Sequence, residues 1–253
     1  MTHPRKLIIP LIIFLFIGSG CRTKINVYDG FESRRLSRIW ETDRMVPASL
    51  KIQSDIVHKG KRAAKITLRT GDIYEPGTGK SASTERDELE EIELLESVEH
   101  VKYEYQFSLF LPQSFPFVNT RLVIAQWKQH CPHGAQCSDD SPVIAIRYIA
   151  GKLYVTVNTD SGQKTIYTTD NEVRNQWLDF KFQIMFSRQS DGEIKAFLND
   201  KEIINYNGIT SYTENSGYAS KSRYYFKMGL YRDIMQEPMT IYIDEYRKRE
   251  MTD

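Results

Sequence analysis

Polar and apolar residues alternate along much of the chain, which is the pattern of a β-strand with one buried face. The clearest run extends from Val101 to Leu111, where every second residue is apolar and Pro112 follows. A second run at 178–186 precedes the turn Asp191-Gly192 and a shorter apolar run at 194–198, as in a β-hairpin. These runs predict antiparallel strands and very little helix.

Further strands are predicted at short intervals. Residues 143–149 and 153–157 flank the turn Ala150-Gly151, the chain turns again at Asn199-Asp200, and residues 240–246 alternate as a last strand. Closely spaced strands with turn residues between them favour an all-β sandwich of two antiparallel sheets. No repeat or linker divides residues 21–253, so one domain is expected. Residues 72–84, rich in Gly, Ser and Thr, are expected to form one long loop, and such loops are often functional.

Three predicted strands carry a polar face where side chains far apart in the sequence could meet. Period-two alternation places Gln126 and Lys128 on one face together with Leu122 and Ile124, and His130 continues that face if the strand persists. The same alternation places Tyr225, Lys227, Gly229 and Tyr231 on one face of residues 224–232. It also places Arg86, Glu88 and Glu90 on one face of residues 85–91. Each face taken alone is also typical of a solvated strand.

Composition and charge exclude several classes of protein. The 253 residues are 40% hydrophobic, 26% charged and 12% aromatic, which is ordinary for a globular domain. The 34 Lys and Arg residues nearly balance the 33 Asp and Glu residues. A nucleic-acid partner is therefore not expected, because proteins that bind nucleic acids usually carry a strongly basic domain.

The N-terminus has the features of a secretory signal. Arg5 and Lys6 precede an apolar run from Leu7 to Ile17 that is too short to span a bilayer comfortably, and Gly18, Ser19 and Gly20 then precede Cys21. Small residues before a cysteine resemble the bacterial lipobox. We therefore expect a signal peptide at 1–20, a lipid on Cys21 and an exported lipoprotein held in a membrane, in the outer membrane at its periplasmic or cell-surface face. Simple cleavage near Gly20 is the alternative.

The two remaining cysteines predict a disulfide. Cys131 and Cys137 are separated by five residues, and an even pair in an oxidising compartment favours a bond that closes a small loop. A zinc site with His130 and His133 is the alternative. Its support is weaker, because the cysteine spacing is wider than usual and no second ligand pair follows.

In order and spacing, these segments resemble the jelly-roll polysaccharide lyases, a group that includes heparin lyase I, glucuronan lyase and, more distantly, the alginate lyases. The resemblance rests on Glu85-Arg86-Asp87-Glu88-Leu89, on Ala125-Gln126-Trp127 and, most specifically, on residues 225–232, Tyr-Phe-Lys-Met-Gly-Leu-Tyr-Arg. It implies a concanavalin-like jelly roll with a concave substrate groove. It also implies cleavage of a uronate polysaccharide by β-elimination, in which a base removes the C5 proton and a 4,5-unsaturated product forms.

The resemblance also assigns roles to residues. Gln126 and Arg86 would neutralise the substrate carboxylate, because the C5 proton becomes acidic only when that charge is compensated. Tyr231 would protonate the leaving oxygen and, in a syn elimination, also act as the base. A tyrosine base needs cations beside it, which Lys227 and Arg232 are expected to supply. Tyr225, Glu88, Lys227 and Arg232 are the expected substrate-binding residues.

One position departs from the family pattern. Related lyases often carry a histidine two residues after the glutamine, and this chain has Lys128 there, with His130 two residues further on. Lysine is a poor base unless it is desolvated. Three hypotheses stay open: Lys128 binds an anionic group while Tyr231 transfers both protons, His130 replaces the missing base, or the site is inactive.

Two other classes of function are considered. Glu85, Asp87 and Glu90 superficially match the acidic triplet of laminarinase-like hydrolases, and a non-catalytic glycan-binding sandwich is the second alternative. No cofactor or catalytic metal is expected, the resemblance leaves a structural calcium open, and the anionic polysaccharide is the expected partner of a monomeric protein.

Overall fold

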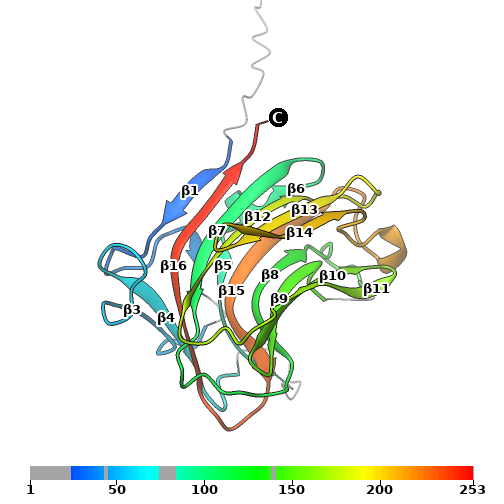
Figure 1. Cartoon of the computed structure of the whole chain (residues 1–253). Coiled ribbons are helices and arrows are strands. Elements are labelled where there is room, and N and C mark those ends of the chain that lie inside the picture. The colour runs from blue at the N-terminus through cyan, green and yellow to red at the C-terminus, as the bar shows by residue number, and fades with distance from the viewer. Residues whose placement is uncertain (1–23, 43–44, 74–83, 138–140, 253) are drawn as a thin grey trace, which may run out of the picture.

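The computed structural model describes residues 24–42, 45–73, 84–137 and 141–252, and almost all of its regular structure is β-strand (Figure 1). The strands are β1 (Asn26–Asp29), β2 (Trp40–Glu41), β3 (Leu50–Gln53), β4 (Ala63–Leu68), β5 (Thr84–Glu91), β6 (Ser97–Val98), β7 (Lys102–Phe110), β8 (Leu122–Gln129), β9 (Ile144–Ile149), β10 (Lys152–Thr159), β11 (Gly162–Thr168), β12 (Trp177–Met185), β13 (Glu193–Leu198), β14 (Lys201–Asn207), β15 (Arg223–Asp233) and β16 (Met239–Glu250). Two short 3-10 helices, Glu93–Leu95 and Glu214–Ser216, complete the regular elements.

The strands form two antiparallel sheets, as the alternation predicted. The first sheet has the order β14-β13-β12-β7-β16-β4-β3, with β1 paired to β16, and the second has the order β11-β10-β9-β8-β15-β5-β2, with β6 paired to β15. Figure 1 shows the two sheets as layers, with β1 beside the C-terminal strand β16. Neighbours far apart in sequence, such as β8 and β15, are what a jelly roll requires.

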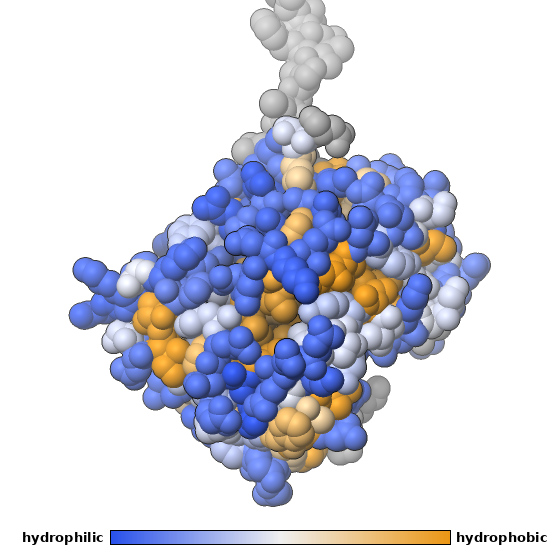
Figure 2. All heavy atoms as spheres, in the orientation of Figure 1, coloured by the Kyte–Doolittle hydropathy of each residue, from blue (hydrophilic) through white to orange (hydrophobic). Residues whose placement is uncertain are grey.

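Aromatic side chains from both sheets fill the space between the layers. Trp127 of β8 lies 4.8 Å, centroid to centroid, from both Phe182 of β12 and Phe226 of β15, and Phe107 of β7 lies 5.3 Å from Phe226. Figure 2 shows a mostly hydrophilic surface, with hydrophobic residues gathered in the middle of the view. Burial of these large rings is the main source of stability for the sandwich.

Two predicted turns have the backbone that tight hairpins need. Ala150 and Gly151 have φ of 48° and 86°, and Asn199 and Asp200 have φ of 49° and 62°. Two successive positive φ angles match the right-handed twist of the strands on either side. The hairpins β9-β10 and β13-β14 are therefore set by local sequence.

The predicted disulfide is present, with Cys131 and Cys137 joined and their Cα atoms 6.0 Å apart. The zinc alternative is therefore wrong for these sulfurs. Residues 1–20, Cys21 and most of the predicted loop at 72–84 lie outside the described residues. Within the described ranges, no helix has the length and apolar character to cross a membrane.

Candidate active site

Four neighbouring strands of the second sheet bring the predicted site residues together. In the strand register, Arg86 of β5 pairs with Tyr231 of β15, Tyr231 pairs with Val123 of β8, and Val123 pairs with Arg147 of β9. Directly paired residues of antiparallel strands point to the same face. One cross-strand row therefore carries Arg86, Tyr231 and Arg147 on a single surface.

The face assignment of β8 needs one correction. Leu122 and Ile124, expected beside Gln126, belong to the core, whereas Val123 faces the site. The register between β8 and β9 shifts between Val123 and Ala125, so one extra residue interrupts the alternation. Such a bulge re-aims the side chains beyond it, and period-two counting cannot detect it.

These side chains line one cleft of about 420 Å³. Four of its lining residues, Arg86, Gln126, Lys128 and Tyr231, were predicted from the sequence as site residues. The others are Arg121, Val123, Ser141, Pro142, Arg147 and Gln163. Four of these ten residues are Lys or Arg and none is acidic, so the cleft suits an anionic ligand.

Tyr231 lies between two guanidinium groups. The guanidinium carbon of Arg86 is 4.3 Å from the ring centre, and that of Arg121 is 5.4 Å away. Arg121 is held by Asp233, whose carboxylate accepts its hydrogen bond at 2.6 Å. The cations beside Tyr231 are therefore Arg86 and Arg121, and not the predicted Lys227 and Arg232.

Glu88 connects the two residues that were expected to bind the substrate carboxylate. It accepts a hydrogen bond of 2.5 Å from the amide nitrogen of Gln126, and its other oxygen lies 3.4 Å from Nε of Arg86. Burial acts against the charge of Arg86, yet Glu88 and Tyr231 raise the pKa of its guanidinium overall. Glu88 is not among the residues that line the cleft, and these two contacts let it orient Gln126 and Arg86 there.

Lys227 and Tyr225 also lie beneath the surface. Lys227 is 2% exposed and forms an ion pair of 2.7 Å with Glu90, and its ammonium group lies 5.1 Å from the ring centre of Tyr225. Burial lowers the pKa of Lys227, and Glu88 and Glu90 oppose that shift. Neither residue lines the cleft, although Lys227 pairs with Gln126 and Tyr225 with Lys128 in the strand register, so their role in substrate binding stays a prediction.

Arg232 points the other way, into the interior between the sheets. Its side chain is fully buried and forms an ion pair of 2.7 Å with the equally buried Glu85. The expectation that Arg232 contacts substrate is therefore wrong, because alternation along β15 places it on the face opposite Tyr231. Glu85 and Asp87 are fully buried as well, which separates them from Glu90 on the other face of β5.

His130 lies at the end of β8, outside the residues that line the cleft. Its Nε2 contacts a carboxylate oxygen of Glu96, and its ring is 4.6 Å from that of Tyr225. Lys128 lines the cleft directly. Of the two candidates for the missing histidine, the structure brings Lys128 and not His130 to Tyr231.

Arg121 and Arg147 were missed by the sequence reasoning. Arg147 is half-buried and donates a hydrogen bond of 3.2 Å to the hydroxyl of Thr156. Burial lowers its pKa, and repulsion from Arg121 lowers it further. Arg147 is the one charged residue in the apolar strand Ile-Ala-Ile-Arg-Tyr-Ile, and that signal could have identified it.

Gly229 permits the close pairing of β15 with β5 beside the site. Its φ is 153°, and a Cβ atom there would lie 2.2 Å from the carbonyl oxygen of Asp87. A larger residue would push the two strands apart between Lys227 and Tyr231. The glycine of the motif therefore keeps Arg86 next to Tyr231.

No group of three or more His, Cys, Asp or Glu side chains in the described part of the chain is arranged to hold a metal ion.

Comparisons with known proteins place these features in a family. The family described as polysaccharide lyase matches residues 28–247, and no curated protein matches in sequence. An endo-β-1,4-glucuronan lyase from the fungus Trichoderma reesei has a similar structure, with a TM-score of 0.67 and 18% identity over 89% of this chain and 95% of that chain. An alginate lyase of polysaccharide lyase family 7 gives 0.55 and 16% over 82% and 84%, and a GH131 β-glucanase catalytic domain from Podospora anserina gives 0.60 and 13% over 90% and 93%. At these identities the likeness shows the shared fold.

Proposed function

The chain belongs to the polysaccharide lyase family, and we propose that it cleaves a uronate-containing polysaccharide by β-elimination in the cleft around Tyr231. The observation that carries the proposal is the lining of the cleft, where, among the described residues, a phenol lies with four cationic side chains and no acidic one. Such a lining attracts a polymer with a carboxylate on each uronate ring. It also places positive charge where the reaction develops negative charge.

The first task of the site is to make the C5 proton acidic. As that proton leaves, negative charge spreads onto the neighbouring carboxylate, and hydrogen-bond donors directed at this group stabilise the intermediate. Arg86 and Gln126 supply these donors, and Glu88 holds both in place. One N–H of the Gln126 amide donates to Glu88, which leaves its second N–H for the substrate.

Tyr231 then transfers the protons. In its anionic form it removes the C5 proton, the bond between C4 and the glycosidic oxygen breaks, and Tyr231 returns the proton to that oxygen. The guanidinium groups of Arg86 and Arg121 lie beside this ring, so positive charge is present where negative charge develops during the reaction. Lys128 binds an anionic group of the substrate, because it lines the cleft while His130 lies outside it.

The burial of Glu85 and Asp87, two members of the acidic triplet, argues against the hydrolase alternative. Glycoside hydrolysis needs two carboxyl groups that face the same glycosidic bond. Glu85 is paired with buried Arg232, and Asp87 accepts a hydrogen bond from the backbone N–H of Val46. Neither carboxylate reaches a sugar in the cleft.

The test is product analysis with purified protein on glucuronan, alginate and heparin. We expect the ultraviolet absorbance of an unsaturated uronate to appear with at least one polymer and to be absent with Tyr231→Phe. Tyr242→Phe is the matched control, because Tyr242 lies on β16 of the first sheet, whereas the cleft is on the second sheet. Reducing ends without that absorbance would identify a hydrolase, and binding without either product would identify a glycan-binding protein.

Export and lipid attachment at Cys21 remain predictions from the sequence. The disulfide between Cys131 and Cys137 supports an oxidising compartment. Metabolic labelling with a fatty acid, compared between the wild-type chain and Cys21→Ser, tests the anchor.

A further inference from the structure

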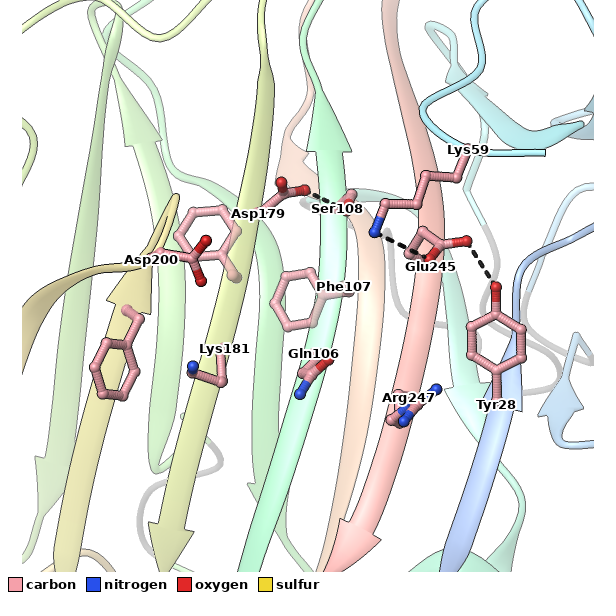
Figure 3. Close-up of a pocket in the computed structure, with 12 residues that line it drawn as sticks. Tyr28, Lys59, Gln106, Phe107, Ser108, Asp179, Lys181, Asp200, Glu245 and Arg247 are labelled. Atoms are coloured by element: carbon pink, nitrogen blue, oxygen red, sulfur yellow. Dashed lines mark hydrogen bonds and ion pairs between the residues drawn. The ribbon is translucent and has the colours of Figure 1, made fainter.

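A second row of side chains crosses the outer face of the first sheet, the sheet that does not carry the cleft. In the strand register, Tyr28 of β1 pairs with Arg247 of β16, Arg247 with Gln106 of β7, Gln106 with Lys181 of β12, and Lys181 with Phe197 of β13. Figure 3 shows Tyr28, Arg247, Gln106 and Lys181 following one another across these strands. The row has an aromatic ring at each end and an amide between two cations.

This row forms the floor of a groove of about 370 Å³. Tyr28 is 53% exposed at one end. Along one side, Lys59 forms an ion pair of 3.5 Å with Glu245, and Glu245 also accepts the hydrogen bond of the Tyr28 hydroxyl. Ser108 donates to Asp179 on the same side. Those contacts hold two of the three acidic side chains that line the groove, and the third is Asp200 at the Phe197 end.

The two cations of the row differ from several others on this sheet, which form ion pairs. Arg249, Lys195 and Lys102 each form an ion pair, with Glu104, Glu202 and Glu193 respectively. Within the described residues, no carboxylate partner is found for Arg247 or Lys181, and the contacts made by these two are with rings. Arg247 lies 5.4 Å from the ring centre of Tyr28, and Lys181 lies 4.3 Å from that of Phe197.

The dimensions of the row suit an extended polymer. Five adjacent strands span four interstrand steps, which is about 19 Å at the usual strand spacing. That length accommodates several sugar rings in succession. The exposed ring of Tyr28 can stack on a sugar face, the Gln106 amide can bond hydroxyl groups, and cations with no carboxylate partner among the described residues can bind carboxylates.

We propose that this row is a second, non-catalytic binding site for an acidic polysaccharide chain. Because it lies on the other sheet, it holds a different stretch of polymer from the one in the cleft. Attachment at a second point raises the effective concentration of polymer at the enzyme. The site would therefore increase affinity for long chains and leave the turnover of short oligosaccharides unchanged.

The test is affinity electrophoresis through gels that contain glucuronan, alginate or heparin, with neutral hydroxyethyl cellulose as the control polymer. Tyr231→Phe is the background, so that polymer is not degraded during the run. We expect the double variant Lys181→Ala/Arg247→Ala to bind the retarding acidic polymer about tenfold more weakly. The matched control Lys102→Ala/Arg249→Ala removes the same charge from the same face, but from cations that are already paired, and is expected to bind within about twofold of the background protein.

The aromatic end is tested separately. Tyr28→Ala should weaken binding several-fold, whereas Tyr28→Phe, which keeps the ring, should not. Equal weakening of binding by both double variants would mean that only the overall charge of this face matters, and would overturn the proposal. Unchanged binding in Lys181→Ala/Arg247→Ala would overturn it too. Retardation by no acidic polymer would overturn it as well.

The same variants, made without Tyr231→Phe, separate this proposal from the proposed function. Turnover of a short oligosaccharide should match the wild type when the row is altered. Loss of short-chain turnover in Lys181→Ala/Arg247→Ala, in a protein with unchanged melting, would show that the row serves the cleft and would overturn a separate site. If no polymer is cleaved, the proposed function fails, and the binding measurements still decide whether the row is a polysaccharide-binding site.

Discussion

Replacing Arg147 by Gln should weaken catalysis and stabilise the free protein at the same time. Arg147 lines the cleft with no carboxylate partner found among the described residues, and burial and Arg121 both disfavour its charge. The unfavourable charge of Arg147 destabilises the folded protein whenever substrate is absent. Removing that charge should therefore raise the free energy of unfolding by up to about 1 kcal/mol. An anionic substrate that pairs with Arg147 would lose a charge-assisted contact of about 1.5–3 kcal/mol.

This loss corresponds to a decrease in kcat/KM of roughly 10- to 150-fold. Most of it should appear as a higher KM, because a carboxylate away from the reacting bond is bound equally in the ground state and the transition state. Steady-state rates from the absorbance of the unsaturated product, on the polymer that is cleaved, give both constants. Chemical denaturation of the same preparations gives the change in stability.

Two control variants sharpen this prediction. Arg147→Lys keeps the charge and should retain part of the affinity. Arg121→Gln leaves Asp233 without its partner and should not stabilise the protein. If Arg147→Gln unfolds more easily and keeps the wild-type KM, then Arg147 has a structural role through Thr156 and the reasoning fails.

Three further predictions concern stability. Burial raises the pKa of Asp87 to about 7, so the native state keeps a proton that the unfolded chain releases above about pH 4. The free energy of unfolding therefore falls as the pH rises from about 4 to 7. Asp87→Asn should remove this fall and gain up to about 2 kcal/mol at pH 8 relative to pH 4, and parallel pH profiles of the two proteins would contradict this. Arg232→Met should lower the free energy of unfolding in denaturant by about 3–5 kcal/mol, because Glu85 loses its buried partner. Adding Glu85→Gln to that variant should restore part of the lost stability. Unchanged stability in Arg232→Met would show that the pair is not needed. Cys131→Ser should lower stability by about 2 kcal/mol for so short a loop, and unchanged thermal melting would argue against the bridge in solution.

The strands could be predicted because each has a local cause. Alternation from Val101 to Leu111 specifies β7 whatever lies beside it, and residues that tolerate positive φ specify the turns at Ala150-Gly151 and Asn199-Asp200. The disulfide followed from two cysteines close in sequence. Arg86, Gln126 and Tyr231 were found because each stands on the polar face of a strand and within a family motif.

Only the tertiary structure decided which side chains meet. The bulge in β8 turns Val123 toward the cleft and Ile124 into the core, because the extra residue arises from pairing with β9 and not from the sequence of β8 alone. Contacts between strands tie Glu88 to Gln126 and Lys227 to Glu90. Burial removes Arg232 from the cleft, since the depth of a side chain depends on its neighbours in other strands. Arg147 and the outer row from Tyr28 to Phe197 exist only through register across strands, and register is a property of the assembled sheet.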